Sequence, residues 1–308
     1  MAYRLERGES VLHGLRRVVR DEIESAGAKL AGNHPIGRDK AIHETRKSIK
    51  KVRALLRLVS EEMHGVEPRE NRRLRDIARR LSRYRDAFVM VETFDDLRRK
   101  FRTETFRKLS RTRARLIDRR NTTRKEQDVV IVVEHAAAAL SHVAQRVSHW
   151  TLDAEGYAAI GPGLERTFRA GRAALAVVRE DPRAENFHDL RKRVKDHWYH
   201  VRLLENLWTD LMAGYEKSLR NVETWLGNDH NLAVLRDMLL ADPESYGAPE
   251  EIELMFDLID RYQKELREQA VSLAERIYEE KPAEFTRRMH HLWDTWRQHP
   301  KLKSPTAA

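Results

Sequence analysis

The sequence contains no cysteine among its 308 residues. This absence excludes disulfide frameworks, thiol nucleophiles and zinc sites built on sulfur ligands. It is compatible with a reducing compartment such as the cytosol. Any chemistry of this chain must therefore rest on other side chains.

Glycine and proline are also scarce, with 13 and 9 residues. They cluster between stretches in which apolar residues recur every three or four positions, such as 11–23 and 254–266. Long helices joined by short turns have this distribution. The β-branched segment 128–133 runs directly into an alanine-rich stretch, so we expect it to be helical as well. The predicted fold class is all-α.

Long hydrophobic runs are missing too. The longest one, residues 129–133, is far shorter than the roughly 18 apolar residues that a membrane span requires. The opening residues, MAYRLERGES, have no apolar run of the kind found in secretory signals. We therefore expect a soluble, cytoplasmic protein without a membrane span.

Charged residues, in contrast, make up 35% of the chain, with 59 Lys and Arg against 49 Asp and Glu and a net charge of +10. Abundant charge of both signs favours long solvated helices with ion pairs one turn apart. The positive excess favours a polyanionic partner. Nucleic acid, polyphosphate and anionic membrane are all consistent with composition alone.

An internal repeat is the most informative feature of the sequence. The segment H-E-T-R-K-S-I-K at 43–50 corresponds to H-D-L-R-K-R-V-K at 188–195, which lies 145 residues later. The same offset relates a second motif region, 81–86, to 226–231. One offset without gaps across two motif regions predicts that the chain consists of two related halves.

Each repeated segment places its cations on one face of a helix. At about 100° per residue, the basic residues of 43–57 fall on one arc and the apolar residues on the opposite arc, and 188–202 repeats this arrangement. Solvated faces usually mix Glu with Lys, yet no acidic residue follows Glu44 until Glu61. Successive cations stand about one turn apart, ~5 Å, so a flexible phosphate chain can lie along each row.

At these motifs the sequence resembles the CHAD family (conserved histidine α-helical domain), over 43–59 and 188–204 together with the second motif region. The resemblance implies one helical domain over 1–308 with halves of about 1–152 and 153–308. It implies two four-helix bundles related by a pseudo-twofold axis, whose basic helices line a central basic cavity or pore. It also implies binding of inorganic polyphosphate and a location at polyphosphate granules.

The second half departs from the family pattern in two places. Residues 196–199 read D-H-W-Y where relatives usually continue with Lys or Arg. Asn231 stands where an Asp is usual. The loss of Lys or Arg at 196–199 reduces the cation density, and hence the expected affinity, of the second half.

We therefore expect non-catalytic binding of inorganic polyphosphate, with phosphate or sulfate able to occupy the same site. The candidate binding residues are the cations and histidines of the repeated regions. They are His43, Arg46, Lys47, Lys50, Arg53, Arg57, Arg75, Arg79 and Arg85 in the first half, and His188, Arg191, Lys192, Lys195, Arg202, Arg220 and His230 in the second.

Two other functions are consistent with the charge. Nucleic-acid binding is the first alternative, although the basic faces carry few of the aromatic residues that stack on bases. A phosphoanhydride-processing enzyme is the second, but it would need clustered carboxylates for Mg²⁺ or an activated nucleophile, and the basic helices have neither. No metal or cofactor is expected, because neither His43 nor His188 belongs to an H-x-x-x-H or H-E-x-x-H pattern.

Overall fold

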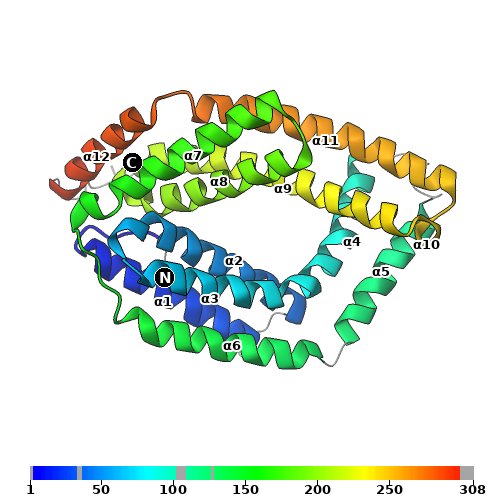
Figure 1. Ribbon diagram of the computed structural model, residues 1–308, viewed down its shortest axis with the longest axis horizontal. Coiled ribbons are helices and arrows are strands. Elements are labelled where there is room, and N and C mark those ends of the chain that lie inside the picture. The colour runs from blue at the N-terminus through cyan, green and yellow to red at the C-terminus, as the bar shows by residue number, and fades with distance from the viewer. Residues whose placement is uncertain (1–2, 33–36, 102–108, 126–127, 299–308) are drawn as a thin grey trace, which may run out of the picture.

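The computed structural model describes residues 3–32, 37–101, 109–125 and 128–298, and Figure 1 shows its architecture. These residues form twelve α-helices and a few short 3₁₀ turns, with no strand among them. The all-α prediction is therefore confirmed. No helix in this part of the chain is long and apolar enough to cross a membrane.

Four helices of the first half pack together: α1 (Val11–Leu30), α2 (Arg38–Leu58), α3 (Val66–Arg80) and α6 (Asp128–Val147). α1 packs against α2 and α6, and α3 packs against the same two helices. Their apolar stripes share one buried core. The segment 128–133 forms the beginning of α6, which confirms that it is helical.

The second half contains α7 (Gly161–Glu180), α8 (Ala184–Leu203), α9 (Thr209–Ala241), α11 (Pro249–Ile277) and α12 (Pro282–Gln298). α8 packs against both α7 and α9, α11 packs along α9, and α12 packs against α7. At 33 residues, α9 is one continuous helix. The matching part of the first half is divided between α3 and the next helix, α4 (Ser82–Phe101).

Two helices of the first half reach across to the second. α4 (Ser82–Phe101) contacts α9 and α11, and α5 (Ser110–Lys125) contacts α4 and the short α10 (Pro243–Tyr246). These helices share a separate hydrophobic core with α9 and α11. In Figure 1, α4, α5 and α10 lie together at one end of the long axis. The two halves are therefore interlocked rather than independent.

Close contacts also join the halves where α2 ends. A β-carbon at Gly163 of α7 would lie 1.7 Å from the carbonyl oxygen of Leu58, so only glycine allows this approach. Nearby, the buried His200 of α8 donates a hydrogen bond from Nε2 to the carbonyl of Ala54 at 2.8 Å. These contacts hold α8 beside α2.

Candidate polyanion-binding site

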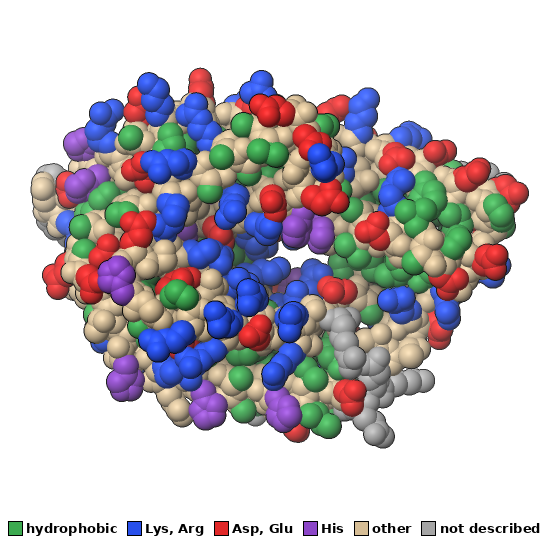
Figure 2. Space-filling model, in the orientation of Figure 1, with side chains coloured by type: hydrophobic (Ala, Val, Ile, Leu, Met, Phe, Trp, Pro, Cys, Tyr) green, Lys and Arg blue, Asp and Glu red, His purple; other side chains and the backbone are tan. Residues whose placement is uncertain are grey.

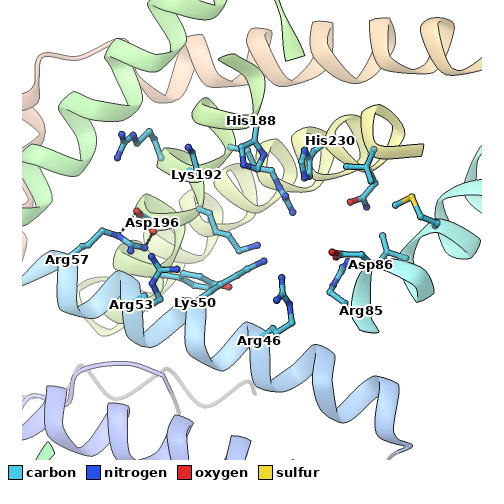
Figure 3. Close-up of a pocket in the computed structure, with 18 residues that line it drawn as sticks. Arg46, Lys50, Arg53, Arg57, Arg85, Asp86, His188, Lys192, Asp196 and His230 are labelled. Atoms are coloured by element: carbon cyan, nitrogen blue, oxygen red, sulfur yellow. Dashed lines mark hydrogen bonds and ion pairs between the residues drawn. The ribbon is translucent and has the colours of Figure 1, made fainter. Parts of the chain in front are cut away.

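A central cavity of about 500 Å³ lies between the polar faces of α2 and α8, with α4 and α9 completing its walls (Figure 3). Figure 2 shows Lys and Arg side chains gathered around a hollow at the centre of this face. Both halves of the chain line it. The lining residues are Arg46, Lys50, Arg53, Arg57, Arg85, Asp86, Val89, Met90, His188, Arg191, Lys192, Arg193, Lys195, Asp196, Tyr199, His230, Asn231 and Val234.

The first row of cations comes from α2. Arg46, Lys50, Arg53 and Arg57 recur every three or four residues and so share one face of the helix. Residues on the opposite face, such as Ile49, are fully buried in the core. Burying such a side chain contributes roughly 1.5–3 kcal/mol. The apolar face therefore fixes the rotation of α2 and directs the cations into the cavity.

The second row comes from α8. His188, Arg191, Lys192 and Lys195 line the same cavity, while Val194 on the opposite face is fully buried. The two repeated segments, far apart in sequence, thus meet in one space. In Figure 3 the labelled residues of α2 and α8 point toward each other across it.

A smaller pocket of about 250 Å³ adjoins the central cavity and shares several of its residues. His43 and Lys47, at the beginning of the α2 row, line this pocket and not the central cavity. Lys50 and Lys195 line both. The two spaces are therefore parts of one basic region.

One carboxylate from α9 neutralises part of the α8 row. Lys195 Nζ donates to Glu223 Oε1, and Nη2 of Arg191 lies 3.3 Å from the same oxygen. Burial opposes ionisation of Glu223, but Lys195 and Arg191 outweigh it and hold the pKa of Glu223 below its usual value. Glu223 is thus an internal counter-ion in the pocket that adjoins the central cavity.

Lys50 occupies the matching position on α2 without such a partner. No hydrogen bond or ion pair to its ammonium group is present within the described residues. Burial and the surrounding cations, Lys195 foremost, hold the pKa of Lys50 well below its usual value. Burial also lowers the pKa of Lys195, but there the charge of Glu223 acts in the opposite direction. The repeat places Ala78 where the second half has Glu223.

The last cations of the two rows have different partners. Arg57 binds Asp196 across the boundary between the halves, with Nε 2.8 Å from Oδ2 and Nη2 donating to Oδ1. Arg202, the counterpart of Arg57, lies outside both pockets, 3.9 Å from Glu216. The pair of Arg57 and Asp196 joins α2 to α8 at one end of the cavity.

Comparison with protein-family models identifies the domain. The model described as the CHAD domain matches residues 22–240. The chain belongs to the CHAD family. The match includes both repeated segments and the helices that line the cavity, and it confirms the resemblance seen in the sequence. A search of curated proteins finds no match.

Two histidines of the CHAD domain face each other in the cavity wall. The ring centroids of His188 and His230 are 4.3 Å apart. Burial, together with His188 and nearby cations, lowers the pKa of His230 to about 4. Burial and nearby cations also lower the pKa of His188. Both rings are therefore neutral at pH 7, whereas the matching pair in the first half consists of His43 and the permanently charged Arg85.

Three other predicted residues lie outside both pockets of the CHAD domain. Arg75 and Arg79 of α3 and Arg220 of α9 are exposed to solvent and line neither pocket. Their neighbours Leu74 and Leu219 are fully buried. Because these leucines turn inward, the arginines turn toward solvent. The structure therefore does not bring them to the cavity.

The sequence-based site contained only cations and histidines, and the structure adds acidic and aromatic residues. Asp86, Asp196 and Tyr199 line the central cavity, and Glu223 lines the adjoining pocket. Asp196 and Tyr199 lie in the segment where the second half departs from the family pattern. Glu223 could have been noticed only as an acidic residue opposite Ala78 in the repeat.

Proposed function

We propose that this CHAD domain binds inorganic polyphosphate in the central cavity. The observation that supports the proposal is the meeting of two basic rows, from α2 and α8, at one cavity of about 500 Å³. A flexible phosphate chain can place its oxygens against the guanidinium forks of Arg46 and Arg53 and the ammonium of Lys50. Membership of the CHAD family favours the same ligand. We expect this binding to occur in the cytoplasm, at polyphosphate granules.

The surroundings of the acidic residues favour binding of the ligand without phosphoryl transfer. Asp196 is engaged by Arg57, and Glu223 by Lys195 and Arg191. Across the described ranges, no group of three or more His, Asp or Glu side chains is arranged to hold a metal ion. Phosphoryl transfer usually relies on such a metal clamp. The cations are therefore proposed to hold the ligand and not to activate it.

The aromatic content of the site favours polyphosphate over nucleic acid. Single-stranded nucleic acids are commonly held by bases stacked on exposed aromatic rings. Tyr199 is the aromatic residue among the lining of the central cavity, and it is only 1% exposed. A ligand made of phosphate alone needs no such platform. DNA or RNA that displaced polyphosphate at equal phosphate concentration would overturn this ranking.

Charge reversal at the matching lysines tests the proposal. Lys50→Glu combined with Lys195→Glu should abolish retention of polyphosphate, because it places two anions between the rows. Lys217→Glu combined with Lys264→Glu is the matched control. Both lysines are exposed and lie outside both pockets, and the two substitutions change the net charge by the same amount as those at Lys50 and Lys195. Affinity of the unmodified chain should fall steeply with salt, because binding releases counterions.

Folding of each variant is checked by circular dichroism and thermal melting. If the double reversal does not fold, the milder pair Lys50→Gln and Arg53→Gln removes two cavity cations without introducing charge. Retention of polyphosphate by a folded variant of either kind would show that the ligand binds elsewhere.

A further inference from the structure

Lys50 and Lys195 are matching lysines in one cavity, yet in the part of the chain that the structure describes only Lys195 forms an ion pair with a carboxylate. Lys195 donates to Glu223 Oε1. Lys50 has no carboxylate partner within the described residues, and its side chain projects from α2 into the cavity between Arg46 and Arg53 (Figure 3). The protein thus contains its own internal comparison between a paired and an unpaired lysine.

The surroundings of Lys50 favour its uncharged form. The residue is partly enclosed by the cavity wall, and Lys195, Arg191, Arg46 and Arg85 all repel a positive charge on its nitrogen. Burial and these cations hold the pKa of Lys50 well below its usual value. Lysines placed among other cations or desolvated are activated as nucleophiles, because the free amine carries the reactive lone pair. Lys50 is therefore expected to be the most nucleophilic lysine of the cavity.

The same cations determine which electrophile can reach this amine. A cavity lined by guanidinium groups concentrates small phosphate-bearing anions. An acyl phosphate combines such an anion with a reactive carbonyl carbon. Its phosphate can bind the arginines while its carbonyl lies beside Lys50, and a cavity of about 500 Å³ has room for a molecule of this size. Neutral acylating agents have no such attraction to the cavity.

We propose that Lys50 is a modification site that is acylated by acyl phosphates while the cavity holds no polyanion. The lone pair of Lys50 Nζ attacks the carbonyl carbon, and the bond between that carbon and the phosphate oxygen breaks. Its electron pair leaves with inorganic phosphate, and the nitrogen loses one proton to water as the amide forms. The product lacks the charge of Lys50, so acylation weakens polyanion binding.

Occupancy of the cavity controls this reactivity. A bound polyanion stabilises the ammonium form of Lys50 and excludes the acyl phosphate from the arginines. Lys195 does not share this reactivity, because Glu223 stabilises its ammonium form whether or not ligand is present. Acylation of Lys50 would therefore mark the empty state of the cavity. This part of the inference rests on the proposed function.

The experiment treats the full chain with acetyl phosphate at pH 7.5 and follows acetylation of each lysine by peptide mass spectrometry over time. Lys50 should react at least about tenfold faster than Lys195 and than Lys217, an exposed lysine outside both pockets. With acetic anhydride, which is neutral, the preference for Lys50 should shrink several-fold. Equal rates at Lys50 and Lys195, or the same preference with both reagents, would overturn the proposal.

Two further arms separate the possible outcomes. Glu223→Gln should raise the reactivity of Lys195 toward that of Lys50, and a melting curve shows whether this variant is folded. If it is not, Glu223→Asp, whose shorter side chain lengthens the contact with Lys195, should shift the ratio between the two lysines in the same direction. An unchanged ratio in a folded variant would contradict the role of Glu223.

Prior saturation with polyphosphate should suppress acetylation of Lys50 and leave Lys217 unaffected. Selective acetylation of Lys50 in the free chain together with absent protection would contradict polyphosphate binding at this site, but not the reactive lysine. Protection without selectivity in the free chain would contradict the reactive lysine alone.

Discussion

The two halves of this CHAD domain share several cations at matching positions, but these cations lie in different surroundings. Lys50 on α2 has no carboxylate partner within the described residues, whereas Lys195 on α8 is paired with Glu223. The first half has Ala78 at the position of Glu223, and the backbone carbonyl of Ala78 accepts a hydrogen bond from Arg46.

The difference continues further along the two helices. Arg53 of α2 lines the central cavity, but its counterpart on α8 is Trp198, whose Nε1 donates to Glu216 at 3.1 Å. The first half therefore supplies most of the positive charge that is free to meet a ligand. A repeated row of cations predicts where a site lies, but the neighbouring helix determines how much of its charge remains available.

Removing the unpaired lysine should have the largest effect. Lys50→Met should lower polyphosphate affinity by about 10- to 100-fold, because a charge-assisted hydrogen bond contributes about 1.5–3 kcal/mol. The matched change in the other half is Lys195→Met with Glu223→Gln, which removes an ion pair of no net charge and should cost less than about threefold. Titration calorimetry with polyphosphate of one length measures both. Equal losses would contradict the asymmetry between the halves.

Releasing the paired lysine should strengthen binding. Glu223→Gln frees Lys195 and Arg191 for phosphate, and we expect affinity to rise about tenfold, equivalent to about 1.4 kcal/mol. The plot of log affinity against log salt should become steeper by about 0.7–0.9 for each additional phosphate contact. Binding measured at several salt concentrations tests both effects. Unchanged affinity and slope would mean that the α8 row does not meet the ligand.

The imidazole pair should make binding depend on pH. His188 and His230 are neutral at pH 7 in the free domain, and the pKa of His230 is about 4. A bound polyanion favours their charged forms and raises both pKa values, so binding takes up protons and affinity should rise roughly fivefold from pH 7.5 to pH 5.5. Replacing both histidines with Gln should flatten this profile. An affinity that fell on acidification would contradict the assignment.

The stability of the ligand-free domain should change in the opposite direction with pH. The unfolded chain has histidine pKa values of about 6.5, so it binds more protons than the native domain between about pH 6.5 and 4. The depressed native pKa of His230 therefore contributes stability above that range, and this contribution is lost as pH falls through it. Melting curves at pH 7.5 and 5 should show a lower Tm at pH 5, and polyphosphate should offset the loss.

The outer arginines should have the smallest effect. Arg75 and Arg220 are matching residues of the repeat, and both are exposed outside the pockets. Arg75→Ala combined with Arg220→Ala should change affinity by less than about twofold at physiological salt, because the interactions of exposed charges outside the pockets are screened by water and salt. A pull-down on immobilised polyphosphate measures this change in affinity. A tenfold loss would show that the ligand extends onto the outer faces of α3 and α9.

Local patterns made much of the molecule predictable. Apolar spacing predicted the all-α class, and the repeat located the basic segments at 43–57 and 188–202. The same patterns also predicted Arg75 and Arg79 as site residues, but these arginines line neither pocket. The patterns of a single segment do not specify how α3 is rotated against its neighbours. That rotation depends on burial of residues such as Leu74 in a core shared by several helices.

The sequence by itself determined which segments are helical and which face of each basic helix carries its cations, because these properties depend on residues within a few turns of one another. Only the tertiary structure decided that both rows face one cavity, that Arg57 meets Asp196 and that Glu223 forms an ion pair with Lys195 but not with Lys50. Whether a charged side chain is paired depends on contacts between residues that lie far apart in the chain. No spacing rule within a single helix specifies them.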